Sequence, residues 1–256
     1  INFRDLGTIR DPVPRRIPYP RIPNSDGAGE VIAVGSDVAS VKPGDRVVSC
    51  FFQRWIDGAC SIEAMNSALG GALDGVLAEE VNLSADGVVP IPAHLSYAEG
   101  ATLPCAALTA WNAIVEVGRV KAGDTVLMLG TGGVSIFALQ FARLMGARTI
   151  ITSSSEEKLA RARELGASLT INYRQKPDWE NAVLGATEGK GVDLTVEVGG
   201  AGTLPRTIAA TRVAGTIALI GVLTGGQIDP VTLMRKSIRL QGIYVGSRRM
   251  FLDMNR

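Results

Sequence analysis

The sequence predicts an α/β fold, in which a doubly wound parallel sheet follows a smaller β-rich region. From about residue 121 onward, short apolar runs alternate with amphipathic runs, as in βαβ units. A glycine-rich turn, LGTGGVS at 129–135, separates the first apolar run from the first amphipathic run. Before about residue 95 the chain is irregular and rich in proline and glycine, with strand-like runs at 29–35 and 45–49. These three observations define the predicted class.

The second region is expected to hold strands separated by helices. The expected strands are 125–130, 148–153, 169–173, 192–198, 216–222 and 238–246. The expected helices are 136–146, 156–166, and segments near 178–188 and 203–212. The helix over 156–166 has acidic residues in its first turn and a glycine at its end, which suits the two ends of a helix. Such an alternation predicts a Rossmann dinucleotide-binding sheet.

Composition and charge narrow the classes of function. The 256 residues are 46% hydrophobic, and the formal net charge is +1 with both signs interspersed, so we expect no nucleic-acid partner. No apolar run reaches the ~18–20 residues of a membrane span, so we expect no membrane partner. Three sparse cysteines favour a reducing, cytoplasmic compartment. The single histidine, His94, excludes a histidine pair as the acid and base.

The glycine-rich turn predicts a site for a dinucleotide. Gly130 permits the tight turn, Gly132 lets the backbone approach a pyrophosphate, and Ser135 stands where a third glycine is usual. Amide groups at the start of the following helix would face the anion. The residues assigned to the cofactor at this turn are Gly130, Thr131, Gly132, Gly133 and Val134. The alternative is a glycine-rich turn that binds no ligand.

The residues after the second expected strand favour NADP(H). NAD-binding domains place an acid about 20 residues beyond the glycines, where it binds the ribose hydroxyls. Here that strand ends at Ser153, whose hydroxyl can donate to a 2′-phosphate. Lys158 and Tyr173 are expected to complete a phosphate pocket; the alternative for Lys158 is a solvated helix residue. Glu156 and Glu157 are expected to favour the helix N-terminus and to point to solvent.

Several stretches carry a resemblance to a known family. They are NFRD (2–5), SDGAGEVIAVG (25–35), KPGDRV (42–47), LPCAALTAW (103–111), AGDTVLMLGTGGVS (122–135), INYR (171–174), VEVGGAG (196–202) and GIYVGSR (242–248). This combination resembles the medium-chain dehydrogenase/reductase superfamily over the whole chain. Within the superfamily it is most similar to the zinc-independent alcohol dehydrogenase-like and quinone oxidoreductase-like branches.

The resemblance implies a division into domains. It places a GroES-like catalytic domain at 1–100, a Rossmann domain at 101–248 and the return to the catalytic domain at 249–256. The active site would lie in the cleft between the two domains. Family members extend further at both ends, so we expect this chain to be truncated at both ends. Many members are dimers through the edge of the Rossmann sheet, so we expect a homodimer in which 238–246 pairs with a second copy.

The resemblance also implies that zinc is absent. Zinc-dependent members bind catalytic zinc through two cysteines and a histidine, and the matching positions here are Asn2, Ser25 and Cys105. Asp26 matches a neighbouring family acid, but it cannot replace a nitrogen and sulfur ligand set by itself. In the family, the lobe that binds structural zinc uses four closely spaced cysteines. The matching region here, which begins near residue 50, has only Cys50 and Cys60. We therefore expect no metal.

The expected reaction is hydride transfer between NADP(H) and a carbonyl, enone or quinone. The resemblance implies further cofactor contacts at Gly199, Gly221, Val245 and Ser247. Asn2, Asp5 and Thr109 are the candidate catalytic or lining residues, and Asp5 could relay a proton through water. The alternatives are that the first two only hold a loop and that Thr109 only packs in a helix. The aromatic residues early in the segment 51–75 suggest a hydrophobic ligand.

Two other functions remain open. One is an alcohol dehydrogenase that oxidises a hydrophobic alcohol without zinc. The other is a relative that binds a dinucleotide without turnover, which the missing zinc ligands favour and the complete fingerprint opposes. Activity toward quinones or enones with NADPH would separate the enzyme from the non-catalytic protein. Assays in both directions would separate the two enzymes.

Overall fold

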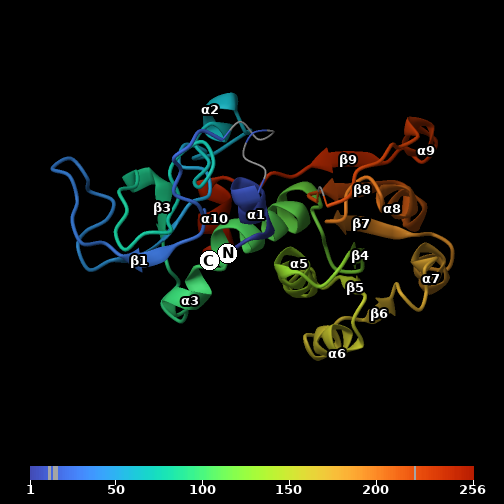
Figure 1. The fold of residues 1–256 in the computed structure, drawn as a ribbon. Coiled ribbons are helices and arrows are strands. Elements are labelled where there is room, and N and C mark those ends of the chain that lie inside the picture. The colour runs from blue at the N-terminus through green and yellow to red at the C-terminus, as the bar shows by residue number, and fades with distance from the viewer. Residues whose placement is uncertain (11–12, 14–16, 222) are drawn as a thin grey trace. The chain divides into compact units, whose positions relative to one another are not determined.

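The computed structural model describes residues 1–10, 13, 17–221 and 223–256. The chain forms two compact units. The first unit comprises 1–108 and 245–256, and the second comprises 109–244. Figure 1 colours the chain from its N-terminus to its C-terminus and labels many of the helices and strands.

The second unit is built on a parallel sheet of six strands. They are β4 (Thr125–Met128), β5 (Arg148–Ser153), β6 (Leu169–Asn172), β7 (Val192–Glu197), β8 (Thr211–Leu219) and β9 (Arg239–Gly242). Their order is β6-β5-β4-β7-β8-β9, and every pairing is parallel. The order reverses between β4 and its neighbour β7, which is the doubly wound arrangement. The predicted fold class of this unit is therefore confirmed.

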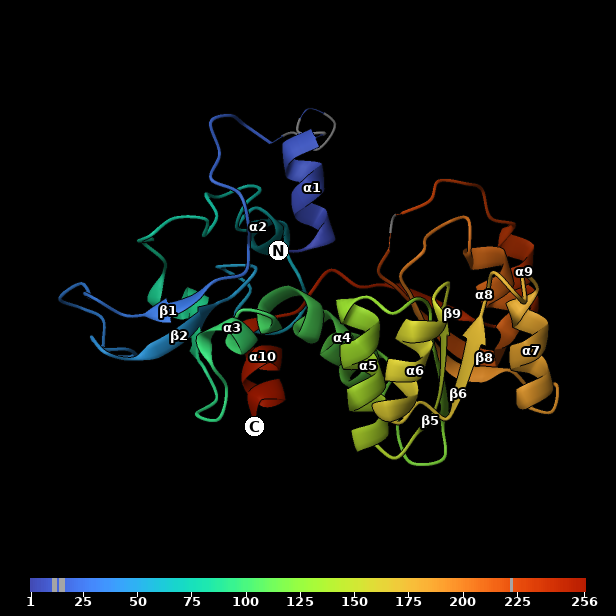
Figure 2. The same cartoon turned by 60° about the horizontal axis from the view of Figure 1, so that its bottom comes forward.

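Helices cover both faces of this sheet because each buried strand has apolar side chains on both sides. The helices are α5 (Gly133–Leu144), α6 (Glu156–Glu164), α7 (Trp179–Ala186), α8 (Leu204–Ala210) and α9 (Pro230–Arg235). Met128 and Ile151 belong to the core that includes α5 and α6, which lie side by side in Figure 2. Leu127 and Ile150, one residue earlier in each strand, belong to the core that includes α7. Alternate residues of a strand thus reach opposite faces.

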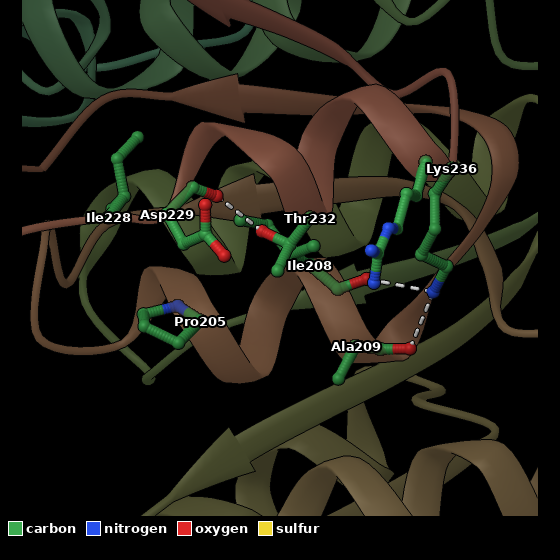
Figure 3. Close-up of a pocket in the computed structure, with 8 residues that line it drawn as sticks. Pro205, Ile208, Ala209, Ile228, Asp229, Thr232 and Lys236 are labelled. Atoms are coloured by element: carbon green, nitrogen blue, oxygen red, sulfur yellow. Dashed lines mark hydrogen bonds between the residues drawn. The ribbon is translucent and has the colours of Figure 1, made fainter.

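Helix α8 ends beside a groove of about 400 Å³ between α8 and α9 (Figure 3). Lys236 Nζ donates hydrogen bonds to the carbonyl oxygens of Ile208 and Ala209, each at 2.9 Å. A cation at this position satisfies free carbonyl groups and suits the negative end of the helix dipole. Partial burial lowers the pKa of Lys236. Since α8 follows β7 and α9 follows β8, the groove lies among the helices that accompany the later strands of the sheet.

The first unit holds a three-stranded antiparallel sheet, in the order β1-β2-β3. Its strands are β1 (Ala28–Glu30), β2 (Arg46–Ser49) and β3 (Val88–Pro90). Its helices are α1 (Phe3–Arg10), α2 (Ile62–Met65), η1 (Ala85–Gly87), α3 (Tyr97–Gly100), the π-helical η2 (Leu103–Ala107) and α10 (Arg248–Asn255). Two further helical segments, α4 (Leu108–Trp111) and the π-helical η3 (Asn112–Val117), follow η2 along the chain. Among the described residues, no helix is both long and apolar enough to cross a membrane.

The aromatic residues Phe51, Phe52 and Trp55 form part of the core of the first unit. Their exposed fractions are 1%, 1% and 6%. The rings of Phe51 and Phe52 meet edge to face at 4.8 Å, and those of Phe52 and Trp55 at 5.7 Å. Edge-to-face pairs of this kind stabilise a packed interior. The suggestion that they signal a hydrophobic ligand is therefore not supported, because their surfaces are used in packing.

Several predicted element boundaries are wrong. The strand expected at 29–35 is instead β1, which begins at Ala28 and ends at Glu30, although Val31 still exchanges backbone hydrogen bonds with Asp45 and Gly44. The strand expected at 238–246 covers only Arg239–Gly242 before the chain leaves the sheet. The residues at 211 and 212, expected in a helix, instead begin β8. Its early part pairs with β7 through a register shift, which the apolar pattern does not reveal.

Candidate functional site

The fingerprint turn of the second unit has the backbone that its glycines predict. Gly130 has φ +70°, a conformation that favours glycine, and its N–H donates to Thr152 Oγ1 at 3.1 Å. Gly132 is the extended N-cap of α5, and a Cβ placed on it would meet nothing within 4 Å. Ser135, which replaces the third glycine, is buried and donates from Oγ to the carbonyl oxygen of Leu129 at 2.7 Å. This bond ties the helix to the end of β4.

The start of α5 is suited to an anion. Its N-cap has no side-chain hydrogen bond, and its first turn has no acidic residue. The amide groups of a helix N-terminus are unsatisfied within the helix and carry the positive end of its dipole. Open space in front of Gly132 lets a phosphate approach these groups. The residues of this turn therefore fit the pyrophosphate of a dinucleotide.

The three residues of the expected phosphate pocket lie at the ends of β5 and β6 and on α6. Ser153 is buried, and its Oγ lies 2.9 Å from Thr131 Oγ1, so it links the ends of β5 and β4. The N–H of Tyr173 donates to the carbonyl oxygen of Ser153 at 3.1 Å, and Tyr173 is 40% exposed. Lys158 is exposed in the first turn of α6 and forms no salt bridge with another described residue. Its ammonium group is thus available to a ligand.

A carboxylate also lies at this edge of the sheet. Glu156 accepts a hydrogen bond from Asn172 Nδ2 at 2.6 Å, and its other oxygen lies 3.9 Å from Arg163. Glu156 is exposed at the start of α6, where its charge suits the helix dipole. Both observations agree with the expectation for Glu156, and the bond from Asn172 adds a contact with the end of β6 that the sequence did not predict.

The two glycines expected near the nicotinamide lie in loops that follow β7 and β8. A Cβ on Gly221 would lie 1.7 Å from the carbonyl oxygen of Val198, so no other residue fits this backbone. The N–H of Thr224 donates to the carbonyl oxygen of Gly199 at 3.0 Å, and that of Ala201 donates to Thr224 at 3.2 Å. The structure thus brings the two loops into direct contact.

Glu197 is a site residue that the sequence reasoning missed. It is the last residue of β7, it is fully buried, and its carboxylate accepts hydrogen bonds from Gly199 and Gly200. The hydroxyls of Thr203 and Thr207 also donate to it. An acid within the apolar run VDLTVEV was the available signal, because a charged residue in a central strand requires partners.

In the first unit, Asp26 joins two of the residues that the family resemblance singled out. Ser25 Oγ donates to Asp26 Oδ1 at 2.6 Å, and the N–H of Cys105 donates to Oδ2 at 3.1 Å. Burial raises the pKa of Asp26, although these bonds and the side chain of Asn2 oppose the rise. The Nδ2 atom of Asn2 is itself buried and has no hydrogen-bond partner of good geometry among the described residues. The Asn2 amide thus lies near enough to Asp26 to affect its pKa, but makes no well-formed hydrogen bond with it.

Asp5 holds the start of α1. Its Oδ2 accepts from the backbone N–H of Asn2 at 2.7 Å, and its Oδ1 accepts from Arg4 Nη1 at 3.3 Å. Arg4 Nη1 also donates to the carbonyl oxygens of Leu69 and Gly70. Asp5 is 2% exposed, so both of its oxygens serve this network. The geometry gives Asp5 a positioning role for Asn2.

The first-unit residues do not fit a zinc ion. Asn2, Ser25, Asp26 and Cys105 offer an amide, a hydroxyl, one carboxylate and one thiol. Protein zinc sites use three or four ligands drawn mainly from cysteine and histidine. Burial raises the pKa of the Cys105 thiol, and the nearby Asp26 carboxylate raises it further. Within the described ranges, no three His, Cys, Asp or Glu residues are placed to hold a metal.

The remaining expected site residues belong to different units. Thr109 is 3% exposed and lies in α4 within the second unit. Val245 and Ser247 lie in the first unit. Ser247 is buried, and its Oγ accepts the N–H of Met250 at 3.2 Å as the N-cap of α10. Val245 has φ +57°, a conformation that is strained for a β-branched residue.

Known protein families match two separate parts of the chain. The description "Alcohol dehydrogenase GroES-like domain" matches residues 1–93, and "Zinc-binding dehydrogenase" matches residues 133–256. A zinc-type alcohol dehydrogenase-like protein of Schizosaccharomyces pombe is 44% identical over 262 aligned positions, which cover 99% of this chain and 76% of the relative. This chain thus spans about three quarters of that relative's length.

Solved structures share the fold. A protein assigned as an alcohol dehydrogenase from Sinorhizobium meliloti 1021 has a TM-score of 0.91 and 43% identity, over 100% of this chain and 76% of that one. An NAD-dependent alcohol dehydrogenase has a TM-score of 0.89 and 34% identity, over 100% and 77%.

Two solved structures at lower identity are named for other activities. A quinone oxidoreductase from Pseudomonas syringae has a TM-score of 0.83 and 27% identity, over 99% of this chain and 74% of that one. A 2-octenoyl-CoA carboxylase reductase in complex with NADP has a TM-score of 0.84 and 27% identity, over 92% and 59%. The chain belongs to the medium-chain dehydrogenase/reductase superfamily and is an alcohol dehydrogenase-like oxidoreductase.

Proposed function

We propose that this oxidoreductase uses NADP(H) and transfers a hydride between the nicotinamide and a carbonyl, enone or quinone, without zinc. The observation that carries the proposal is the open fingerprint turn together with a hydroxyl, rather than a carboxylate, at the end of β5. Gly132 leaves room for the pyrophosphate, and Ser153 occupies the position where an acid would repel a 2′-phosphate.

Lys158 and Tyr173 support the choice of NADP(H). The Lys158 ammonium has no competing ion pair among the described side chains, and the Tyr173 backbone is anchored to the end of β5. Both can approach a dianionic phosphate beside Ser153. The neighbours differ in this respect, since one solved structure is an NAD-dependent alcohol dehydrogenase and another is in complex with NADP. The cofactor preference therefore depends on this chain's own residues.

The proposed catalytic chemistry uses hydrogen bonds in place of a metal. When bound, the cofactor supplies or accepts the hydride. Asn2 Nδ2, which is buried near Asp26 without a well-formed hydrogen bond, would donate to the substrate carbonyl oxygen. Asp5 would hold Asn2 through its backbone N–H, and Thr109 would line the substrate site with its hydroxyl. A donor of this kind stabilises negative charge that develops on oxygen.

Titration with NADPH and then NADH tests the cofactor proposal. A charge-assisted hydrogen bond contributes about 1.5–3 kcal/mol, so NADPH is expected to bind at least about tenfold more tightly. Equal binding, or tighter binding of NADH, would refute the phosphate pocket. Reduction of a panel of enones and quinones, before and after treatment with a zinc chelator, then tests the reaction. Loss of activity on zinc removal would refute the proposed absence of zinc.

Alcohol oxidation is the second candidate function. This candidate is favoured by two similar proteins, since the S. pombe relative is named as alcohol dehydrogenase-like and one similar solved structure is an NAD-dependent alcohol dehydrogenase. Assays with hydrophobic alcohols and NADP⁺ or NAD⁺ would separate it from enone reduction.

We also propose a homodimer, because β9 is the outer strand of the sheet and has one unpaired edge among the described strands. Its size in solution, measured by light scattering, tests this.

A further inference from the structure

We infer that Glu197 is a positioning residue that fixes the loops facing the nicotinamide half of the dinucleotide. The inference rests on the proposed function, and it assigns a role to a buried carboxylate at the end of β7. Buried carboxylates are costly unless they are fully hydrogen bonded, so the partners of Glu197 indicate what its burial achieves. Four groups donate hydrogen bonds to the two oxygens of its carboxylate.

The sheet topology separates the two halves of the dinucleotide. The strand order reverses between β4 and β7, and a dinucleotide lies across such a point at the carboxyl ends of the strands. The loops after β4, β5 and β6 include the fingerprint turn and the proposed phosphate pocket, so they serve the adenosine half. The loops after β7 and β8 are on the other side of the reversal. They therefore serve the nicotinamide half.

Glu197 is hydrogen bonded to both of these loops. Its side-chain Oε1 accepts the N–H groups of Gly199 at 2.7 Å and Gly200 at 3.1 Å. Its main-chain carbonyl oxygen accepts the N–H groups of Ile220 at 2.8 Å and Gly221 at 3.0 Å. One residue thus fixes the turn after its own strand and the exit of the neighbouring strand.

Helix α8 holds the carboxylate from its other side. Thr203 Oγ1 donates to Oε1 at 2.7 Å, and Thr207 Oγ1 donates to Oε2. Thr203 is the N-cap of α8, and its hydroxyl donates to Glu197 and makes no capping bond. The carboxylate consequently lies near the helix N-terminus, where negative charge is favoured.

The loops have little freedom to move independently. A Cβ on Gly199 would lie 2.4 Å from Thr203 Oγ1, and a Cβ on Gly221 would lie 1.7 Å from the carbonyl oxygen of Val198. The surface offered to a ligand here is backbone, whose position the Glu197 bonds set. Displacement of a bound group by about 1 Å is enough to lower reactivity strongly. Glu197 therefore acts on the cofactor through the loops rather than by contact.

The test compares binding of NADPH with binding of 2′,5′-ADP, which lacks the nicotinamide half, to full-length variants by calorimetry. Glu197→Ala is expected to weaken NADPH by about tenfold or more, because buried N–H groups lose a charged acceptor. Binding of 2′,5′-ADP should change by less than about twofold. Glu197→Gln keeps an acceptor oxygen for the Gly199 and Gly200 amides, so NADPH affinity should stay within about threefold of the wild type.

Thr207→Val is the matched control. It removes a donor to the same carboxylate on the α8 side and leaves the loop amides bonded, so it should lower the melting temperature without changing either affinity. If Glu197→Ala does not fold, Glu197→Asp replaces it, because its acceptor retracts by about one carbon–carbon bond, ~1.5 Å. The same selective weakening of NADPH is expected of this variant.

Three results would overturn the inference. One is wild-type affinity for NADPH in the folded alanine or aspartate variant. Another is an equal loss for NADPH and 2′,5′-ADP, which would show a general effect on the fold. The third is a glutamine variant as weak as the alanine variant. If the wild type prefers NADH, NADH and ADP serve as the pair. If the wild type binds neither dinucleotide, the proposed function itself fails, and the inference fails with it.

Discussion

Replacing Lys158 with alanine should weaken NADPH binding and leave NADH binding unchanged. Lys158 is exposed, and its part in the helix cap is a hydrogen bond from its backbone N–H to Ser155 Oγ at 3.3 Å, which alanine keeps. Hydrogen bonds to charged groups contribute about 1.5–3 kcal/mol, and exposure favours the lower end of that range. Since 1.4 kcal/mol is a factor of ten, the Kd for NADPH should rise about tenfold.

The assay is titration of both cofactors at ionic strengths of about 0.05 and 0.5 M, because salt screens an exposed charge. The tenfold effect should shrink at the higher ionic strength. Lys190→Ala is the matched control. Lys190 is also exposed, but it precedes β7 and so lies at the amino ends of the strands, whereas the proposed phosphate pocket lies at their carboxyl ends. An unchanged ratio of NADPH to NADH affinity in Lys158→Ala, or an equal effect in the control, would refute the phosphate pocket.

Three further predictions concern packing and reactivity. Ser135→Ala removes the bond to the carbonyl oxygen of Leu129 and should lower the free energy of unfolding by about 1 kcal/mol in urea titrations; no change would contradict the bond. Gly221→Ala forces a Cβ against the Val198 carbonyl and should lower that free energy by about 1–3 kcal/mol; a neutral result would show that the loop can relax. Cys60 is exposed, whereas burial raises the pKa of another thiol, Cys50, to about 12, so a thiol reagent at pH 8 should label one cysteine in the native protein and three after unfolding. Labelling should quicken as pH rises toward the pKa of Cys60, which burial also raises, because only the thiolate reacts.

Most of the parallel sheet could be predicted because its strands are apolar on both faces. The strand from Arg148 to Ser153 is one such run, and its predicted limits are those of β5. Prediction was poorer where side chains do not determine pairing. β9 is exposed on the sheet edge and ends after four residues, although the apolar pattern continues to Val245. Helix α1 was not predicted, since it is short and buries Asp5 and Thr8 while its apolar residues are exposed.

The candidate site divides in the same way. The fingerprint turn was predictable because its function depends on backbone, and glycine spacing reports backbone directly. Ser135 could be foreseen as a small residue, but not its bond to Leu129. Glu197 was missed because its four donors come from the loop after β7 and from α8, which only the folded chain brings together around the carboxylate. Asp5 was expected either to relay a proton or only to hold a loop. Its oxygens hold Asn2 and Arg4, which agrees with the second alternative, and the proton relay stays a prediction.

Under the proposed function, the first unit limits the substrate class through the strength of its donors. A zinc ion stabilises charge on a carbonyl oxygen by several kcal/mol, and a single amide N–H such as that of Asn2 supplies less. A conjugated acceptor lowers this demand, because the negative charge that follows hydride addition spreads over the enone or quinone. A simple ketone leaves the charge on one oxygen. Ser25 and Cys105 do not add to this donor, because the Ser25 hydroxyl and the Cys105 N–H donate to Asp26. The Asn2 amide therefore favours conjugated acceptors, and kcat/KM should fall steeply when the conjugated double bond of a substrate is saturated.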